Sequence, residues 1–573
     1  MRGYLSRGLD RPATRPANLA LWLDDKPRAL ATLGLALQHL AIQSVYFIIP
    51  AAVAAAITDD AATVTRFVCL SVLAAVAWQV LNLLRRGPVG SGYPVPATHT
   101  AAMLGAYLLV GETGGGFGGM AAMVLLAGIA AIALTFAMQR LRVLLPNEVA
   151  GVVVMLIGVA LAALGTRQIG LQSGQAPGAA TIAVVLVSVA AMAAIALSRT
   201  RAAPFALLLG SLVGVALALP LGEFRGDAAE VLAAQPWFAL PEPFAPDFGQ
   251  VTAAPLLAFL LALVAMRATA AGSLVMAQRA LDAGWTRPDA PPIRRGLLAD
   301  GIAIAFAGLV GGAAPGPNTA ALGLSVTGGV LARRIVWAGV PLLLAVAFCP
   351  KLVALFVLAP APVKAAMLFH AAGLIMANGC QLVTVRLLDS RRGLVVATGL
   401  TAGIAVASAP LGFLSLVPAL ASPLSFGAVV AFLVNLVTLP LVTRRAELSL
   451  TLDMLAGRSV SDWVARTAAG WGLKPATARS AERALVELAE LLAGRGVRSL
   501  DLAARLAEDR VEFALAWAGA PLPAPAARPD AEALLGDDAA RDGFVLWLAT
   551  RETQSFAQRE TPAGQEVRLA FED

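Results

Sequence analysis

Two short stretches rich in glycine and proline interrupt hydrophobic segments of this sequence. They cover residues 90–100 and 311–319. Proline lacks a backbone donor and favours extended backbone, so each interruption predicts a short strand that leads into a half-length helix. The start of that helix offers free N–H groups and a positive dipole end, which suit carbonyl oxygens or an anionic ring. The polar residues at these two positions are Thr98, His99, Asn318 and Thr319.

Threonine and asparagine are also ordinary helix-capping residues, so each position taken alone has a simpler explanation. In hydrocarbon, however, an unpaired backbone group is costly, and a broken helix persists only where it lines a cavity enclosed by protein. A matched pair of such breaks in two halves of a chain indicates the substrate site of a transporter. We therefore predict that the four polar residues line one site.

Gln38 and His39 are adjacent polar residues inside the first apolar run, which begins near Leu30. Polar groups within lipid are costly and normally face the interior of a helix bundle. Gln38 either orients a polar substrate or makes a structural hydrogen bond between helices. We predict the structural role for His39.

Arg267 is a single charge near the middle of the apolar run over residues 261–272. A charge at that depth is a functional candidate by default. Arg267 either attracts an anionic substrate or pairs with Asp300 or Glu148, which we predict to be structural polar residues.

Composition excludes several classes of function. Of the 573 residues 58% are hydrophobic and only 14% are charged, with a mean hydropathy of +0.76. A soluble domain would be about 25% charged, so these values predict a polytopic membrane protein. Three scattered cysteines form no disulfide or metal framework. The sequence has no nucleophile–base set, zinc spacing or phosphate loop, so we expect no enzyme activity, no cofactor and no metal. The net charge of +7 has no basic-aromatic cluster that would indicate nucleic acid.

Apolar segments recur between Leu30 and Val442, and about fourteen are long enough to count as membrane segments or halves of them. They divide about seven and seven around the loop at residues 222–250, and each interruption is the third segment of its half. An odd number per half implies opposite topology, which is an inverted repeat around a midplane site. The predicted fold is an all-α polytopic membrane protein whose two broken segments contain short strands.

Arginines gather on the even-numbered connections between segments, whereas the odd-numbered connections carry little positive charge and include the acidic loop at residues 222–250. The positive-inside rule therefore predicts that both termini are cytoplasmic, in a bacterial-type inner membrane. The final part of the chain is acid-rich, has no spanning run and predicts a small soluble α/β domain. Its expected elements are helices over 460–471 and 476–493 and strands over 511–517 and 567–571. The predicted domains are a cytoplasmic segment at 1–28, a transmembrane transporter domain at 29–445 and a cytoplasmic domain at 446–573.

Several motifs occur in an order that resembles the nucleobase–ascorbate transporter family, the xanthine/uracil permeases. They are Leu37–Leu40, Pro146–Gly158, Gly296–Gly301 with Gly311 and Gly312, Pro317–Thr319 with Gly323–Ser325, Arg333 with Arg334, and Asn378–Gln381 with Arg386–Asp389. The resemblance implies fourteen spans in a seven-plus-seven inverted repeat, with segments 1–4 and 8–11 as a core and segments 5–7 and 12–14 as a gate. It also implies transport of purines, pyrimidines or ascorbate, often with a proton or sodium ion and often as a homodimer.

The chain departs from the family pattern in two places. The family's eighth span usually carries a glutamate that binds the base, and the matching position here is Ala268 or Thr269, beside Arg267. The tenth segment has Ala321 and Leu322 before its glycine, where the family often has a polar residue. Loss of the carboxylate removes the usual means of proton coupling. An arginine at this depth would favour an anion such as urate or a xanthine anion.

In the tail, the stretches in order are Ala484–Glu487, Gly519–Pro523, Asp542 with Gly543, and Trp547 with Leu548. Together they resemble a histidine-kinase-type ATPase or anti-sigma-factor domain. Leu491 falls where that family has its magnesium-binding asparagine, and Trp517 falls where it has its nucleotide-reading aspartate. The resemblance therefore implies a domain that does not bind ATP and has a regulatory or dimerising role with a cytoplasmic partner.

The sequence thus predicts a secondary-active transporter that carries a nucleobase-like ring by alternating access. Gln38, Thr98 and Asn318 would hold the ring edge. One alternative is an anion transporter of the same fold, for sulfate, bicarbonate or a carboxylate. Another is a transporter-like membrane receptor that signals through its tail.

Overall fold

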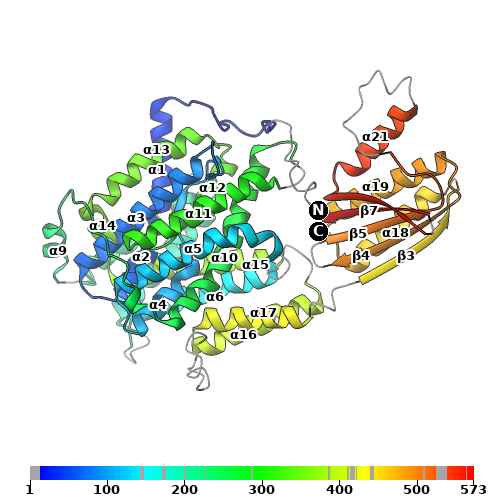
Figure 1. Cartoon of the computed structure of the whole chain (residues 1–573). Coiled ribbons are helices and arrows are strands. Elements are labelled where there is room, and N and C mark those ends of the chain that lie inside the picture. Colours follow the sequence, from blue (N-terminus) through cyan, green and yellow to red (C-terminus); the bar gives the residue numbers. More distant parts are fainter. Residues whose placement is uncertain are drawn as a thin grey trace. The chain divides into compact units, whose positions relative to one another are not determined.

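The computed structural model divides the chain into two compact units, each of which is described by itself (Figure 1). Among the described residues, one unit ends at residue 383 and resumes over 393–432, and the other comprises residues 384–392 and those from 433 onward. The predicted segment at 1–28 lies partly outside the described residues. These are residues 13–572 without 142–146, 171–175, 199, 201, 225, 286–287, 385–387, 409–411, 413–419, 421, 439–443, 454, 508–509, 524–537 and 563.

The larger unit is almost entirely helical. Its principal elements in chain order are α1 Ala29–Val45, α2 Ile48–Ala55, α3 Ala61–Leu83, β1 Ala97–His99, η1 Ala101–Met103, α4 Leu104–Glu112, α5 Phe117–Leu141, α6 Asn147–Gln168, α7 Ala179–Leu197, η3 Ala203–Phe205, α8 Ala206–Ala218, α9 Ala228–Ala234, η4 Phe248–Gln250, α10 Ala253–Leu281, α11 Ala290–Val310, β2 Pro315–Pro317, α12 Thr319–Thr327, α13 Arg333–Ala347, α14 Pro350–Val357, α15 Ala361–Val383, α16 Ser390–Ser408 and α17 Pro423–Thr438.

Several of these helices can cross a membrane. Within the described residues, seven helical spans are long and apolar enough, with α1 and α2 counted as one, and an eighth results if α13 and α14 form one span with a 79° bend. Helices α8 and α17 are apolar but shorter. Large apolar side chains such as Phe136, Leu186 and Leu197 are exposed on the helical unit. Such a surface suits lipid rather than water.

Helices α5 and α11 pack backbone against backbone, side by side in Figure 1. A Cβ atom added at Gly128 would lie 2.2 Å from the Ala305 nitrogen, and one at Gly308 would lie 2.2 Å from the Leu125 nitrogen. Lipid tails are as apolar as leucine, so membrane helices associate through close packing at small residues rather than through the hydrophobic effect. These glycines therefore fix the spacing of the two helices.

The long loop between α8 and α10 is tied to the helix ends beneath it. Phe244 donates its backbone N–H to the Val310 carbonyl at 3.2 Å, and its ring stacks on Phe117 at 4.5 Å between centroids. The Arg66 guanidinium lies 4.1 Å from the centre of the same ring. The loop thus joins the ends of α3, α5 and α11 on one side of the unit.

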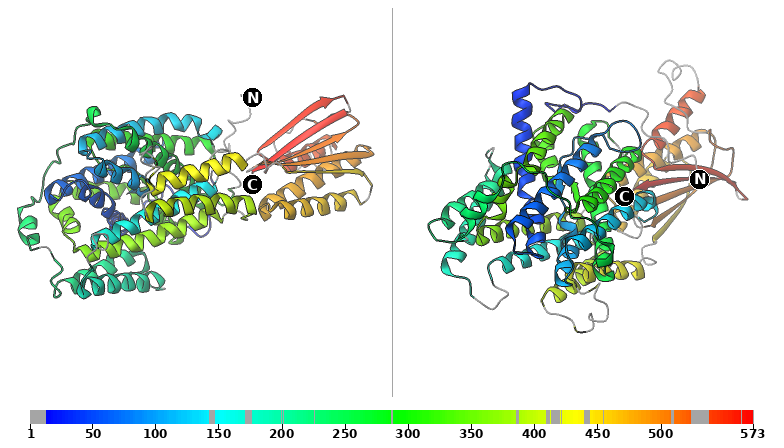
Figure 2. Two further views of the ribbon diagram at one scale, coloured as in Figure 1. Left: turned by 90° about the horizontal axis from the view of Figure 1, so that it is seen from below. Right: turned by 60° about the vertical axis from the view of Figure 1, so that its left-hand side comes forward.

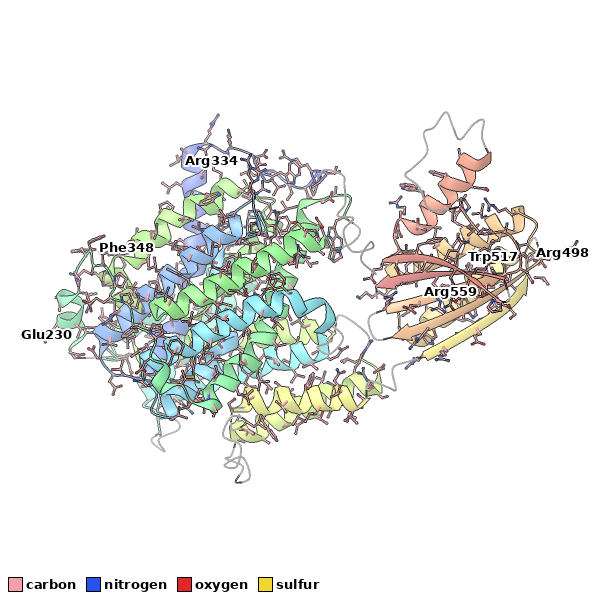
Figure 3. The ribbon with its side chains drawn as sticks, viewed as in Figure 1. Glu230, Arg334, Phe348, Arg498, Trp517 and Arg559 are labelled. Atoms are coloured by element: carbon pink, nitrogen blue, oxygen red, sulfur yellow. The ribbon has the colours of Figure 1, made fainter. Side chains whose placement is uncertain are left out.

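The smaller unit contains a five-stranded antiparallel sheet in the order β3-β4-β5-β7-β6, and its helices α18 and α19 lie along one face of the sheet (Figure 2). Val460, Leu488 and Phe513 belong to its apolar core. Figure 3 labels Trp517 and Arg559 on two of its strands. Its elements are β3 Arg444–Thr451, α18 Ala456–Trp471, α19 Pro475–Gly494, β4 Ser499–Ala507, β5 Arg510–Trp517, α21 Asp538–Thr550, β6 Ser555–Thr561 and β7 Gly564–Glu572.

The four elements predicted in this tail coincide with α18, α19, β5 and β7, whereas β3, β4, β6 and α21 were not predicted. Leu491 and Trp517 are both buried in the apolar core of the tail. Both side chains therefore contribute to the packing of that core.

Candidate functional site

The two interruptions of the sequence meet in space. β1 pairs with β2 in antiparallel register, with Ala97 opposite Pro317, Thr98 opposite Gly316 and His99 opposite Pro315. The ladder is extended by the Asn318 N–H, which donates to the Pro96 carbonyl at 2.8 Å. Helix α4, preceded by the short turn η1, follows β1, and α12 follows β2 directly. The starts of two half-length helices therefore converge on one strand pair.

Two glutamines fix β1 in place. The Gln79 Oε1 accepts from the Ala97 N–H at 3.0 Å and from the Gln43 amide at 2.9 Å. Gln43 also donates to the Ala97 carbonyl at 2.9 Å, and Gln79 donates to the Val336 carbonyl at 2.9 Å. Both glutamines are buried. Our sequence analysis missed them, although each is a polar residue inside an apolar run, the same signal that identified Gln38.

Side chains from other spans satisfy the second break. The Ser71 hydroxyl accepts from the Ala313 N–H at 2.9 Å, and the Tyr107 hydroxyl accepts from the Ala314 N–H at 2.8 Å. Irregular backbone at membrane depth is tolerated when protein groups replace the missing helical partners. The surrounding helices thus supply these partners to the break.

Polar side-chain atoms at the strand pair have no hydrogen-bond partner among the described residues. They are the Thr98 Oγ1, both ring nitrogens of His99 and the Asn318 Nδ2. The backbone of Ser71 lies near the His99 ring. Thr98, His99 and Asn318 are 8%, 2% and 1% exposed. Buried polar groups are normally paired, so a cluster of unsatisfied atoms indicates a place where a ligand completes the hydrogen bonds.

The remaining predicted residues near the breaks lie in different surroundings. His39 is buried, and its Nε2 lies 2.9 Å from the Ser325 Oγ, which joins α1 to α12. Gln38 is half-buried on α1. Thr319 and Thr269 are exposed on α12 and α10. Asn318 accepts the Ala321 N–H at 2.9 Å through its Oδ1, so it is a cap as well as a candidate ligand.

Arg267 lies in a buried network that joins four helices. Its guanidinium donates to the Asp300 Oδ2 at 2.6 Å and to the Thr135 Oγ1 at 2.6 Å. Asp300 also accepts from the Trp78 indole N–H at 2.7 Å. Arg267 and Asp300 are 0% and 1% exposed. Of the alternatives left open by the sequence, this geometry favours pairing with Asp300. Glu148 is buried at the start of α6.

Comparison with known proteins agrees with this architecture. The family model described as "Permease family", for xanthine/uracil permeases, matches residues 30–412. The chain is 24% identical to "Uric acid permease PucJ" of Bacillus subtilis (strain 168) over 395 residues, which is 67% of this chain and 86% of that protein. It is 27% identical to "Uric acid permease PucK" of the same organism over 407 residues, covering 69% of this chain and 91% of that protein.

A solved structure entitled "The overall structure of SLC26A9" superposes with a TM-score of 0.51 at 13% identity, over 73% of this chain and 67% of that chain. This likeness concerns the fold alone. Because the family model spans most of the helical unit and both strand-bearing breaks, the chain belongs to the nucleobase–ascorbate transporter family, a permease family of multi-pass membrane transporters rather than enzymes.

Proposed function

We propose that this permease carries a nucleobase-like ring of the urate, xanthine or uracil class by alternating access. The observation that carries the proposal is the set of buried, unsatisfied polar atoms of Thr98, His99 and Asn318 at the strand pair. Two relatives that cover most of the helical unit are named as uric acid permeases. A planar ring whose edge bears carbonyl and N–H groups would complete these hydrogen bonds.

In this proposal the site is pre-organised before the substrate arrives. Gln43 and Gln79 hold β1, and the Asn318 cap holds the start of α12, so binding would order few side chains. Each hydrogen bond restored to a buried group is worth about 0.5–1.5 kcal/mol net. Gln38, Thr319 and Thr269 would contribute at the rim of the site.

The helix contacts support the inverted repeat of about seven plus seven spans that the sequence predicts. When the segments are numbered in order, α5 packs on α11 as α3 packs on α13, and α1 packs on α13 as α10 packs on α5. Moving every segment number by seven, half of the fourteen predicted segments, turns the first contact of each comparison into the second. The same operation exchanges the two partners of the β1–β2 pair and of the α6–α15 pair, so it leaves both of these contacts unchanged. We assign α1–α5 with α10–α14 to the core, and α6–α8 with α15–α17 to the gate.

Cytoplasmic termini, a homodimer and coupling to a proton or sodium ion are further parts of the proposal. None of the residues in β1, β2 or α12 is acidic. A coupling ion would therefore act through groups other than a carboxylate on these elements. Uptake with and without collapse of the proton and sodium gradients tests the coupling.

The anion alternative has an observation of its own. The Asn318 Nδ2 is a donor, the Thr98 hydroxyl is able to donate, and position 268 or 269 of α10 lacks an acidic residue. Such a site would also accept a small inorganic or carboxylate anion.

Uptake of labelled urate, xanthine and uracil into proteoliposomes separates these possibilities. We expect saturable uptake that is competed by purines or pyrimidines. Competition by sulfate or bicarbonate alone would favour the anion carrier. Binding of a nucleobase without flux would favour a receptor that signals through the tail.

A further inference from the structure

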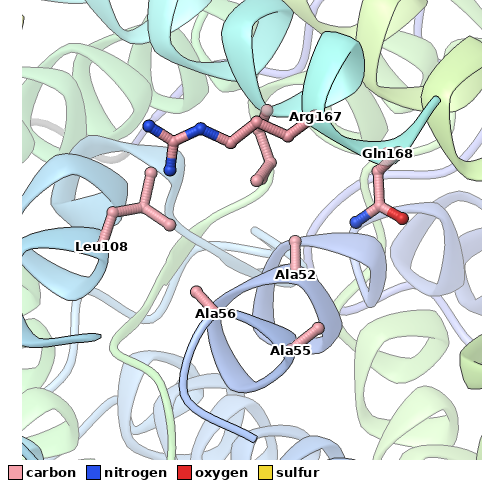
Figure 4. Close-up of a pocket in the computed structure, with 7 residues that line it drawn as sticks. Ala52, Ala55, Ala56, Leu108, Arg167 and Gln168 are labelled. Carbon is pink, nitrogen blue, oxygen red and sulfur yellow. The ribbon is translucent and has the colours of Figure 1, made fainter. Parts of the chain in front are cut away.

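A separate cavity of about 270 Å³ lies between α2, α4 and α6, away from the strand pair. Figure 4 shows the Arg167 guanidinium extended toward the side of Leu108, with the Gln168 side chain also at the cavity. The lining residues are Ala52, Ala55, Ala56, Leu108, Leu164, Arg167 and Gln168. Typical sites for drug-sized ligands measure about 300–1,000 Å³, so this cavity suits one small molecule.

The cavity lies on the same side of the protein as the long acidic loop. Thr181, at the start of α7, donates to Glu223 of that loop at 2.9 Å. The end of α6, which carries Arg167 and Gln168, is connected to this start of α7. The cavity is therefore at the side opposite the predicted cytoplasmic termini.

The same helices connect the cavity with the paired breaks. The Phe47 ring, just before α2, lies 5.7 Å from the His99 ring in an edge-to-face contact. Ala52 to Ala56 follow along α2, roughly 8 to 14 Å further at about 1.5 Å per residue. α4 begins soon after β1 and packs closely on α2, since a Cβ at Gly111 would lie 2.8 Å from the Ala56 carbonyl oxygen. The cavity and the breaks thus lie along one pair of helices.

The lining of the cavity has a defined chemistry. Alanine and leucine side chains provide flat apolar walls that suit the faces of a ring. A guanidinium presents paired N–H donors to a carboxylate-like or enolate edge, and the Gln168 amide adds a donor and an acceptor. Arg167 is exposed, whereas Arg267 is fully buried in its pair with Asp300. Of these two arginines, Arg167 is the one that lines the cavity.

We propose that this cavity is an outer recognition site, where Arg167 and Gln168 capture the anionic form of a planar substrate before it reaches the strand pair. The inference rests on the proposed function, because it takes the transported ring to be an anion such as urate. It makes Arg167 a determinant of specificity rather than part of the midplane site.

The test measures the KM and maximal rate of urate uptake into proteoliposomes for the wild type and for Arg167→Gln, Arg167→Lys and Gln168→Leu. We expect Arg167→Gln to raise KM by about tenfold with little change in maximal rate, the scale of one lost charge-assisted hydrogen bond. Lysine keeps the positive charge but lacks the planar pair of N–H donors, so the KM of Arg167→Lys should lie between the KM values of the wild type and Arg167→Gln. Added salt should raise the wild-type KM and leave that of Arg167→Gln nearly constant.

Lys351→Gln is the matched control. The Lys351 Nζ lies 5.1 Å from the centre of the Trp237 ring, which belongs to the same long loop, and Lys351 does not line the cavity. The substitution therefore removes one positive charge from that side of the protein without changing the cavity. Its KM should equal that of the wild type. An equal rise in KM for Lys351→Gln and Arg167→Gln would indicate a general surface potential and overturn the proposal.

The failure of this inference is distinguishable from failure of the proposed function. Wild-type urate uptake with an unchanged KM in Arg167→Gln would overturn the outer site and leave the function standing. If the wild type transports no nucleobase, the outer site is tested by the change in melting temperature that urate or sulfate causes in the wild type and in Arg167→Gln. Stabilisation lost in Arg167→Gln alone would support the site, whereas equal stabilisation of both proteins, or of neither, would overturn it.

Discussion

Single buried polar residues play two different parts in this transporter. Asp300 accepts from both Arg267 and Trp78, so its charge is compensated inside the bilayer. Thr98 and Asn318, by contrast, retain buried atoms without a partner at the strand pair. The first arrangement stabilises the protein's own packing, whereas the second leaves hydrogen-bonding capacity for a ligand.

Replacing Arg267 should therefore destabilise the fold rather than weaken substrate binding. Arg267→Leu leaves the Asp300 carboxylate buried without its counter-charge, which costs about 3–5 kcal/mol. The double variant Arg267→Leu with Asp300→Leu should recover most of that loss. Thermal unfolding of the purified protein in detergent measures both effects. A normal melting temperature combined with lost anion affinity in the single variant would instead place Arg267 at the substrate.

Asn318 can be divided into its two functions. Asn318→Asp keeps the oxygen that caps Ala321 but loses the unsatisfied Nδ2 donor. We expect an increase in urate KM of about tenfold or more, from one lost donor and an added negative charge. Asn318→Ala should lose the cap as well, with about 1 kcal/mol less stability. Equal KM values for Asn318→Asp and wild type would mean that the amide never meets the substrate.

At the scale of elements, the strand pair depends on helices that flank it in space. β1 has only three residues, and its first residue is held by Gln43 and Gln79. So short a ladder is not stable alone, because few hydrogen bonds offset the ordering of its backbone. The position of β1 is consequently set by α1 and α3.

Gln79→Leu should uncouple β1 from α3. The substitution leaves the Ala97 N–H and the Gln43 amide without their shared acceptor, which costs about 1–3 kcal/mol for each buried group. Substrate binding should fall by at least tenfold in an equilibrium assay. Gln79→Glu is the comparison, because its protonated form keeps both the acceptor for Ala97 and a donor toward the Val336 carbonyl. A Gln79→Leu protein with wild-type binding would show that β1 holds its position without this glutamine.

Much of this architecture could be predicted from local pattern. The Gly- and Pro-rich stretches predicted both strands because proline dictates backbone geometry wherever it occurs. The partners of Arg267, and the roles of Gln43 and Gln79, could not be chosen, because they depend on residues far away in the sequence. Asp300 and Glu148 were equally plausible partners until the packing of α10 on α11 brought Asp300 to Arg267.

At the scale of the whole molecule, the tail has an apolar core of its own. Every residue of that core lies between Ala446 and Phe571. On the open face of its sheet, Glu566 accepts from Arg559 at 2.5 Å and from Arg568 at 2.7 Å. Partial burial alone would raise the pKa of Glu566, but the hydrogen bonds from Arg568 and Arg559 outweigh it and hold the pKa below its usual value.

This shift predicts a tail that weakens in acid. A carboxylate with a lowered folded-state pKa contributes stability above the unfolded value near 4.5, and the contribution is lost as the pH falls through the folded pKa. The protection of the β6 and β7 amides against hydrogen exchange, expressed relative to the intrinsic exchange rate at each pH, should therefore stay constant from pH 7 to about 4.5 and fall at lower pH. Glu566→Gln should cost roughly 1 kcal/mol at pH 7 and flatten this dependence. Glu560→Gln, at an exposed site on the same sheet, should behave as wild type, and an unaltered acid response in Glu566→Gln would refute the assignment.

The antiparallel ladder also bears on biogenesis. During translation β1 is inserted long before the ribosome has made β2. The edge of β1 that pairs with β2 therefore lacks its partner strand during this interval. Gln43 and Gln79 both precede β1 in the chain and already engage Ala97. We expect them to shield the nascent strand until the second half is inserted. Stalled nascent chains ending near residue 250 should accordingly become more protease-sensitive around Ala97 when Gln79 is replaced by leucine, and equal sensitivity would rule this out.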